Sequence, residues 1–131
     1  MKYLTIIFLA MLLMSSCKKE AGEGGTASIT GSVWVKDYNS TFSVLEGEYA
    51  GADEDVYIVY GDNTAGYDDK VSCDYNGKFT FNFLRSGKYT VYIYSKDSTL
   101  QSPSGDVTLI QEIEITKKKE VMELPQFVIF N

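Results

Sequence analysis

The feature that most constrains the fold of this chain is the alternation of apolar residues with polar or small ones at every second position. It is clearest in residues 78–84, KFTFNFL, and in residues 88–95, KYTVYIYS. Successive side chains of a β-strand point to opposite faces of the sheet, so a period of two is typical of strands that bury one face. The rest of the chain after its N-terminal apolar segment shows no helical periodicity, and the sequence therefore predicts an all-β domain.

Seven segments with strand-like patterns are separated by Gly, Asn, Asp and Ser, which are typical of turns. The predicted strands are residues 28–36, 55–60, 70–74, 78–84, 88–95, 107–116 and 121–130. Seven short strands favour a single β-sandwich with Greek-key-type connections. The connection over residues 37–54 is longer than most loops, and it predicts a functional loop or an additional element.

Parity within each strand predicts which side chains face the core. The predicted core residues are Ile29, Val33, Val35, Phe79, Phe81, Phe83, Tyr89, Val91, Ile93, Ile113 and Ile115. In the last strand Met122 and Leu124 have one parity, whereas Phe127 and Ile129 have the other. Pro125 lies between the two pairs and cannot donate a ladder hydrogen bond, so we expect a β-bulge there.

Two turn signals connect these strands. Asn76-Gly77 predicts a type I′ hairpin turn, because both central residues of that turn need a positive φ. The polar stretch 117–120, KKKE, predicts a second hairpin between the last two strands, and we interpret it as a solvated turn rather than a binding patch.

The stretch CDYNGKFTFNFLRSGKYTVYIYSKD (73–97), with SITGSVWV before it and VTLIQEIEITKKKEVMEL after it, resembles the carboxypeptidase regulatory-like, transthyretin-like and Cna-B-like β-sandwiches. Those domains share Asp-x-x-Gly-x-Phe followed by a Leu-x-x-Gly-x-Tyr corner. The matching positions are Asp74, Gly77, Phe79, Leu84, Gly87 and Tyr89. Where the family has Pro before the corner glycine, this chain has Arg85 and Ser86.

This resemblance implies a prealbumin-like or Ig-like fold defined by turns around five residues. They are Asp74, Asn76, Gly77, Gly87 and Tyr89. Modules of this kind serve as spacers, accessory domains and adhesin segments, usually without catalysis.

The start of the chain predicts a secretory signal. Lys2 precedes an apolar segment that ends at Met14, which is short for a membrane span but suits a signal peptide. The residues LMSSC that end at Cys17 resemble a bacterial lipobox, although Met14 replaces the usual Leu, Val or Ile. The resemblance implies removal of residues 1–16 and acylation of the Cys17 sulfur with diacylglycerol. A plain signal peptide with an incidental cysteine is the alternative.

The residues after Cys17 predict a location in a Gram-negative cell envelope. Residues 18–20, KKE, partly resemble the export tag of some surface lipoproteins, so we expect the outer membrane and consider exposure at the cell surface. The glycine-rich remainder of residues 17–27 predicts a flexible tether, which leaves residues 28–131 as one sandwich domain.

Charge and residue content exclude several function classes. The formal net charge of −6 argues against binding of nucleic acids or anionic lipids through charge. The chain has no histidine, which excludes Ser-His-Asp and Cys-His catalysis, the common zinc sites, and the histidine-dependent hydrolases related to transthyretin. If Cys17 is acylated, Cys73 is the only free cysteine, and we interpret it as a structural strand residue. The sequence predicts a non-enzymatic protein without metal or cofactor.

Three chemical alternatives fit the sequence less well than this prediction. Carboxylates at 53–55 and 68–69 could serve a glycan hydrolase, which needs two facing acids. The loop 62–69 offers oxygen ligands for calcium at Asp62, Asn63, Asp68 and Asp69, but without a regular calcium-motif spacing. A Cna-B-like crosslink between Lys36 and Asn131 lacks an identifiable buried acid.

Aromatic residues provide the leading hypothesis for function. The chain has ten tyrosines and one tryptophan, and Trp34, Tyr92 and Tyr94 have the parity opposite to the core residues of their strands. We expect these three to line an outer face that binds a protein or a glycan, because aromatic rings stack on sugars and anchor interfaces. Packing beneath the 37–54 connection is the alternative. The sequence thus predicts a lipid-anchored binding, adhesion or accessory module, with a structural spacer as the alternative function.

Overall fold

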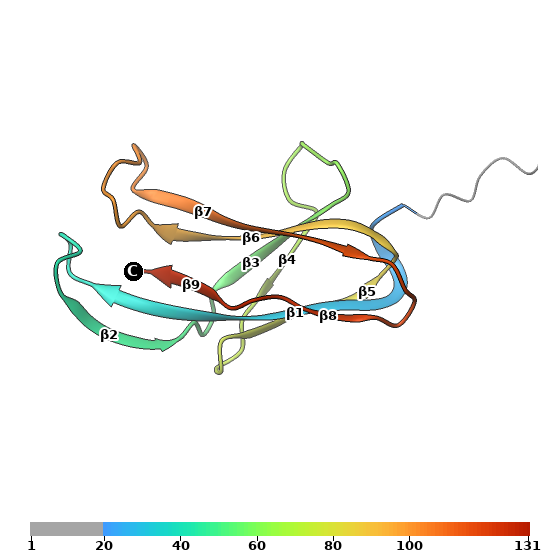
Figure 1. Cartoon of the computed structure of the whole chain (residues 1–131), viewed down its shortest axis with the longest axis horizontal. Helices are drawn as coiled ribbons and strands as arrows, with labels where there is room; N and C mark the ends of the chain where they lie inside the picture. Colours follow the sequence, from blue (N-terminus) through green and yellow to red (C-terminus); the bar gives the residue numbers. More distant parts are fainter. Residues whose placement is uncertain (1–19) are drawn as a thin grey trace, which may run out of the picture.

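The computed structural model describes residues 20–131, and the predicted signal peptide and Cys17 lie outside the described residues (Figure 1). The described chain forms nine strands. They are β1 (Glu23–Tyr38), β2 (Leu45–Ala50), β3 (Asp55–Tyr60), β4 (Asp69–Ser72), β5 (Lys78–Leu84), β6 (Gly87–Lys96), β7 (Asp106–Ile115), β8 (Val121–Glu123) and β9 (Phe127–Phe130). Over this range no residue is helical, and therefore no helix of the described part could cross a membrane.

The strands form two sheets that face each other, as Figure 1 shows. The long strand β1 is the centre of the first sheet, where it pairs antiparallel with β2 and β5 and parallel with β8 and β9. The second sheet has the order β4-β3-β6-β7 and is antiparallel throughout. The all-β class and the two-layer arrangement of the prediction are confirmed.

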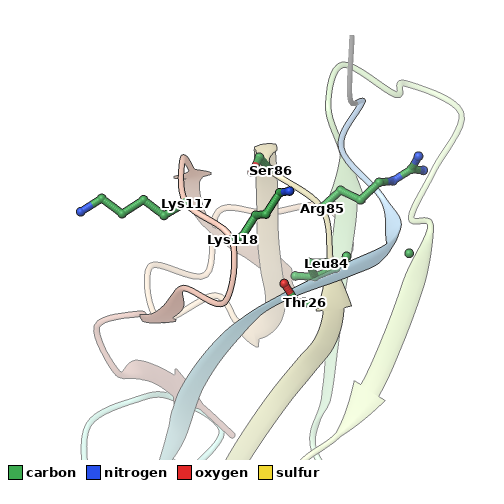
Figure 2. A pocket seen from close by; sticks show the side chains of 8 residues that line it. Thr26, Leu84, Arg85, Ser86, Lys117 and Lys118 are labelled. Carbon is green, nitrogen blue, oxygen red and sulfur yellow. The ribbon is translucent and has the colours of Figure 1, made fainter. Parts of the chain in front are cut away.

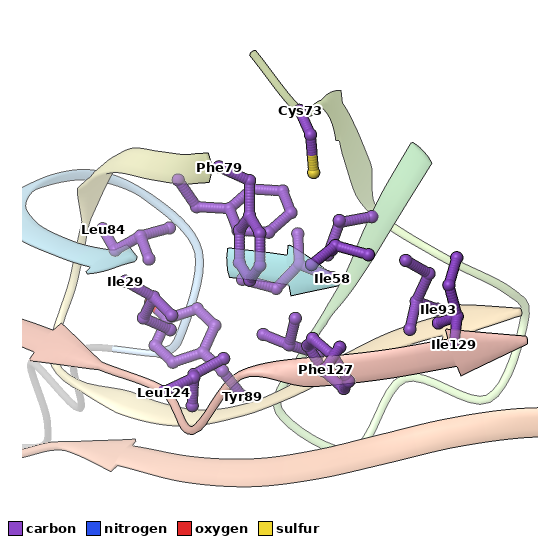
Figure 3. Packing of buried hydrophobic residues seen from close by; sticks show 14 of the residues in the cluster. Ile29, Ile58, Cys73, Phe79, Leu84, Tyr89, Ile93, Leu124, Phe127 and Ile129 are labelled. Carbon is purple, nitrogen blue, oxygen red and sulfur yellow. The ribbon is translucent and has the colours of Figure 1, made fainter. Parts of the chain in front are cut away.

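The core lies between the two sheets (Figure 3). Its buried members are Ala27, Ile29, Val33, Val35, Val56, Ile58, Cys73, Phe79, Phe81, Leu84, Tyr89, Val91, Ile93, Ile115, Leu124, Phe127 and Ile129. Ile113 packs against this cluster while partly buried, so ten of the eleven side chains predicted to face the core do so. Burial of this apolar surface provides the main driving force for folding.

Phe83 is the exception, and its side chain is 72% exposed. Its φ of 59° is in the left-handed region, and the pairing of β5 with β1 shifts register at Ala27. This bulge reverses the alternation, so Leu84 points into the core in place of Phe83.

Two strand predictions are corrected. The strand count is nine rather than seven, because the 37–54 connection contains β2 and the predicted strand 121–130 is divided in two. The predicted strand 121–130 is two strands, because β8 pairs with β1 at Ser28–Thr30 and β9 pairs with it at Val33–Lys36. The change of parity expected around Pro125 is present, since Leu124 and Phe127 are both buried.

Both hairpin predictions are wrong, because β4 and β5, like β7 and β8, belong to different sheets. At Asn76-Gly77 only Gly77 has a positive φ, of 72°, and the Asp74 carbonyl accepts from the Gly77 N–H while the Asp74 N–H donates to Lys78. This pattern belongs to a three-residue loop with a glycine bulge, not to a type I′ turn. Residues 117–120 connect β7 in one sheet to β8 in the other, so they form a crossover.

The start of the domain also differs from the prediction. β1 begins at Glu23 rather than at residue 28, and Ala27 is buried in the core. The Gly22 N–H donates to the Tyr89 hydroxyl over 2.9 Å. Residues 21–27 are therefore part of the folded domain and not a flexible tether.

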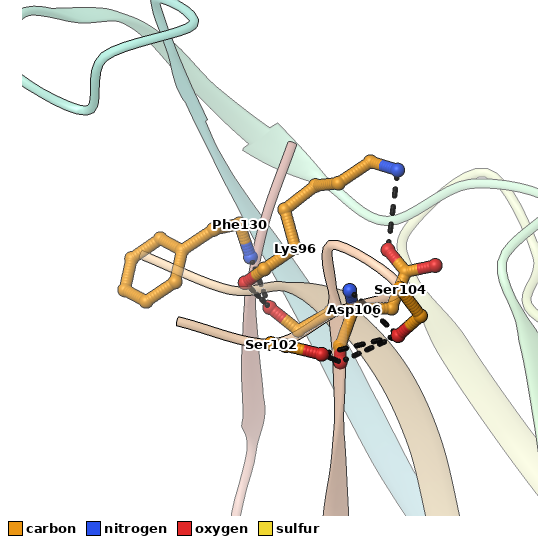
Figure 4. A network of polar contacts seen from close by, with 6 residues as sticks. Lys96, Ser102, Ser104, Asp106 and Phe130 are labelled. Carbon is orange, nitrogen blue, oxygen red and sulfur yellow. Dashed lines mark hydrogen bonds and ion pairs between the residues drawn. The ribbon is translucent and has the colours of Figure 1, made fainter. Parts of the chain in front are cut away.

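Polar contacts close the sandwich at the opposite end (Figure 4). The Phe130 N–H donates to the Ser95 hydroxyl over 2.8 Å, which joins β9 to β6 across the two sheets. The Ser102 hydroxyl donates to the Asp106 carbonyl over 2.7 Å, and the Asp106 carboxylate pairs with Lys96 at 3.1 Å. These contacts fix the loop between β6 and β7.

Candidate functional site

Four tyrosines gather on the outer face of the second sheet. Tyr57 of β3 and Tyr92 of β6 are register partners, and their side chains point outward because their strand neighbours are buried. Their rings are stacked, with centroids 5.1 Å apart and an interplanar angle of 13°. Tyr94 contacts both rings edge-on, and Tyr67 lies 5.0 Å from Tyr57. We call Tyr57, Tyr67, Tyr92 and Tyr94 the tyrosine cluster.

The rings of this cluster differ in how much surface they offer to a ligand. Tyr67 and Tyr94 are each 50% exposed, whereas Tyr57 and Tyr92 are partly buried. Burial raises the pKa of the Tyr92 hydroxyl, and the neighbouring Tyr94 raises it further. At neutral pH the Tyr92 hydroxyl therefore keeps its proton and can both donate and accept hydrogen bonds.

A shallow hollow of about 550 Å³ adjoins the cluster. Its floor includes Tyr92, Tyr94 and Ile110, and Ile110 is 59% exposed although it is the register partner of Tyr92. Polar residues 61–64, GDNT, and the hydroxyls of Thr90 and Thr108 contribute to the lining. The hollow thus combines an apolar floor with hydrogen-bonding groups, a combination typical of ligand sites.

The loop between β3 and β4 is held in place by its own polar side chains. The Asp68 carboxylate accepts from the Tyr60 N–H over 2.7 Å and from the Asn63 side-chain amide over 2.9 Å. The Asn63 side-chain oxygen Oδ1 accepts from the Ala65 N–H over 3.0 Å. These bonds position Tyr67 over Tyr57, so two residues that were candidates for calcium binding instead stabilise one wall of the site.

Trp34 does not belong to this surface. It lies on β1 in the first sheet, pairs with Ala50 of β2, and its indole N–H donates to Glu48 over 3.2 Å. The prediction of one aromatic face with Trp34, Tyr92 and Tyr94 is therefore wrong, although Tyr92 and Tyr94 do lie together. Sequence reasoning missed Tyr57, which the alternation DVYIVY could have indicated, and it missed Tyr67, which lies in a loop without periodicity.

The turn residues named by the family resemblance lie at corners of the chain. The Asp74 carboxylate accepts from the N–H groups of Asn76 and Lys78, both over 2.9 Å. A side chain at Gly77 would meet the Val33 carbonyl oxygen at 2.4 Å, so glycine is required there. Gly87 opens β6, two residues before the buried Tyr89.

Of three other groups that could take part in chemistry, Asp55 is paired with a lysine, while Glu54 and Cys73 are partly or fully buried. Asp55 pairs with Lys70 at 3.7 Å and accepts from the Ser72 hydroxyl over 2.8 Å. Burial raises the pKa of Glu54, with a smaller contribution from Asp55. Burial also raises the pKa of the Cys73 thiol to about 11, so the thiol is protonated at neutral pH.

The proposed metal and crosslinking chemistry also has little support in the geometry. Residues 20–131 contain no group of three His, Cys, Asp or Glu side chains that could hold a metal ion. The Lys36 ammonium lies 3.9 Å from the Glu48 carboxylate. Asn131 contacts Lys36 through the backbone, where its N–H donates to the Lys36 carbonyl over 3.1 Å.

No protein-family model and no curated protein matches the sequence. Similarity to solved structures is partial, as two of the matching structures illustrate. One is a crystal structure of a "putative carbohydrate binding protein" from Pseudomonas aeruginosa, with a TM-score of 0.46, 12% identity, and coverage of 85% of this chain and 92% of that chain. The other is (S)-allantoin synthase, with a TM-score of 0.44, 9% identity, and coverage of 81% of this chain but only 43% of that one.

Proposed function

We propose that the protein is a non-enzymatic, lipid-anchored binding module of a bacterial cell envelope, and that the tyrosine cluster binds a glycan. The observation that carries the proposal is the position of these rings, which lie on the solvent side of a sheet whose other side already holds the core. Tyr94 and Tyr67 expose half of their surface, and no core packing accounts for them.

The chemistry of the surface favours an uncharged sugar chain. Aromatic faces attract the C–H-rich faces of pyranose rings, while nearby hydroxyl and amide groups can bond the sugar hydroxyls. Tyr92, Tyr94 and Ile110 offer the apolar floor, and Thr90 and Thr108 offer hydroxyls. The net charge of −6 disfavours an acidic glycan.

A role in binding rather than catalysis is supported by the state of the reactive groups. The chain lacks histidine, the Cys73 thiol has a pKa of about 11, and Asp55 is paired with Lys70. The lipobox-like residues that end at Cys17 support the lipid anchor. The resemblance to accessory β-sandwich modules supports a role at the cell surface.

The test is affinity electrophoresis of the mature protein in gels that contain one neutral polysaccharide each: hydroxyethylcellulose, amylose, mannan or xylan. We expect at least one of them to retard the wild type and not the double variant Tyr92→Ala, Tyr94→Ala. Tyr75→Ala is the matched control, because Tyr75 is a tyrosine that is 90% exposed on the turn before β5. Circular dichroism would verify that each variant folds.

Two results would reject the glycan proposal. If none of the polysaccharides retards the wild type, the alternative function as a structural spacer gains support. If the double variant and Tyr75→Ala are retarded equally with the wild type, sugar binding lies outside the tyrosine cluster.

A further inference from the structure

Three segments meet at the end of the sandwich where the described chain begins (Figure 2). The Arg85 N–H, in the turn between β5 and β6, donates to the Gly22 carbonyl over 2.8 Å. The Lys119 N–H, in the crossover from β7 to β8, donates to the Thr26 hydroxyl over 3.2 Å. The entry of the chain, the β5–β6 turn and the crossover are therefore fixed beside one another.

Basic residues are concentrated at this end of an otherwise acidic protein. Arg85, Lys117, Lys118 and Lys119 are all exposed, and we call these four residues the basic end. Elsewhere Lys36, Lys70 and Lys96 are paired with carboxylates, but no residue of the basic end forms an ion pair with a carboxylate of the described chain.

Two carboxylates close to the basic end in sequence or through the chain entry, Glu120 and Glu23, are engaged in other contacts. Glu120 accepts from the N–H groups of Thr116 and Lys117, both over 3.1 Å, so it stabilises the crossover backbone. Glu23 accepts from the Tyr60 hydroxyl over 3.5 Å. The basic side chains therefore remain available to an external anion.

A hollow of about 420 Å³ lies within the basic end. Figure 2 shows Lys117 and Lys118 on one side of Leu84 and Thr26, and Arg85 on the other. Gly24, Gly25 and Ser86 complete the lining, so the floor is small and partly apolar while the rim is cationic. In Figure 2 the Lys117 ammonium and the Arg85 guanidinium point away from the hollow, so charge-assisted bonds to phosphate groups would form at the outer rim.

The covalent path to the predicted anchor sets how far this end can lie from a membrane. Ala21 packs against the core, and only residues 18–20 separate it from Cys17. A fully extended chain spans at most about 3.5 Å per residue, so the distance from Cys17 to Ala21 cannot exceed roughly 14 Å. Electrostatic attraction to a charged surface acts over roughly 8 Å at physiological salt. An acylated Cys17 would therefore hold the basic end within, or close to, the reach of lipid headgroups.

We propose that the basic end docks on the anionic phosphate headgroups of the membrane that carries the anchor. This inference rests on the proposed acylation of Cys17. Docking would hold the domain in one orientation, since the lipid alone would leave it free to rotate. Tyr92 and Tyr94 lie five and seven residues along β6 from Gly87, so they would stand about 15–25 Å from the docked end, at roughly 3.4 Å per residue.

The test uses the mature, full-length protein in nanodiscs of phosphatidylcholine alone or of equal parts of phosphatidylcholine and phosphatidylglycerol. Brief acetylation followed by mass spectrometry measures the reactivity of each lysine. We expect the anionic lipid to slow the acetylation of Lys117, Lys118 and Lys119 several-fold, and high salt to remove this protection. Lys78 is the internal control, because it is exposed at the opposite end of β5.

A second readout separates docking from mere proximity to a charged surface. Trp34 is the only tryptophan, so its time-resolved fluorescence anisotropy reports the tumbling of the domain. In anionic nanodiscs we expect slower tumbling for the wild type than for the triple variant Lys117→Gln, Lys118→Gln, Lys119→Gln. The variant Lys78→Gln should behave as the wild type does.

Three outcomes would overturn the inference, and they differ from one another. If the protein enters the nanodiscs but the lysines react equally in both lipids, or the triple variant tumbles as the wild type does, docking is wrong while the anchor stands. If inorganic phosphate protects the lysines equally in neutral nanodiscs, the site binds free phosphate instead of a membrane. Failure of the protein to enter any nanodisc would refute the anchor itself, and the docking with it.

Discussion

The Tyr89 hydroxyl and the Gly22 backbone are joined across 67 residues of sequence, and the hydroxyl accepts the Gly22 N–H over 2.9 Å. The same hydroxyl lies 2.6 Å from the Arg85 carbonyl, to which it donates. Burial raises the pKa of Tyr89, so the phenol keeps its proton at neutral pH. The Tyr89 side chain thereby links the entry of the chain to the β5–β6 turn by hydrogen bonds, and that turn carries Arg85 of the basic end.

Tyr89→Phe should lower the free energy of unfolding by about 1–3 kcal/mol, because removal of the hydroxyl leaves the Gly22 N–H and the Arg85 carbonyl without a partner in a buried place. Urea denaturation measures the change. Tyr75→Phe is the control, since Tyr75 is 90% exposed and should have no effect. Equal stability of Tyr89→Phe and the wild type would show that water replaces the hydroxyl at no cost.

The alternation of residues predicted most of the core because each buried strand has one inward face. Ile29, Val33, Phe79 and Val91 are all buried as their parity required. Phe83 departs from its parity because a bulge depends on how β5 pairs with β1, which is a long-range relationship absent from the local pattern.

Two features could not be predicted from the sequence, and both failures have physical reasons. β2, with the sequence LEGEYA, has mostly exposed residues, so it carries no buried-face alternation. Parity identifies Trp34 and Tyr92 as outward-pointing but does not say from which sheet, and they lie on different sheets. Half of the tyrosine cluster was therefore found from the sequence, and the rest required the topology.

Stacking and hydrogen bonding by Tyr92 can be separated by two substitutions. Tyr92→Phe keeps the ring and its stacking on Tyr57, whereas Tyr92→Ala removes both the ring and the hydroxyl. If glycan binding depends on stacking, Tyr92→Ala should weaken it about tenfold or more, equivalent to about 1.4 kcal/mol, and Tyr92→Phe should weaken it much less. Calorimetric titration with the polysaccharide that retards the wild type would measure both. Equal losses for the two variants would assign the contribution to the hydroxyl.

Acid should destabilise the loop between β6 and β7 through Asp97. Its carboxylate accepts from the Thr99 hydroxyl over 2.7 Å and from the N–H groups of Thr99, Gln101 and Ser102. These bonds, the Thr99 hydroxyl first, lower the pKa of Asp97 from 3.8 to about 2. Because the pKa is depressed in the folded state, the stabilisation is complete above about pH 4 and is lost as the pH falls through about 2.

Thermal unfolding followed between pH 2 and pH 6 tests this expectation. Asp97→Asn should lower the melting temperature at neutral pH and flatten its decline below about pH 4. Asp62→Asn, in an exposed loop, should follow the wild-type curve. A variant Asp97→Asn with the same acid slope as the wild type would assign the acid sensitivity to other carboxylates.

Thiol counting tests both the burial of Cys73 and the proposed acylation of Cys17. Cys73 is 3% exposed and its pKa is raised to about 11, mainly by burial, so the native protein should react very slowly with a disulfide reagent at pH 8. In denaturant the mature protein should show one reactive thiol per chain, because the chain has two cysteines and acylation would block one of them. The acylated variant Cys73→Ser should then show no reactive thiol. Two thiols per denatured wild-type chain would show that Cys17 carries no lipid, and a fast native reaction would show that the β4–β5 corner opens to solvent.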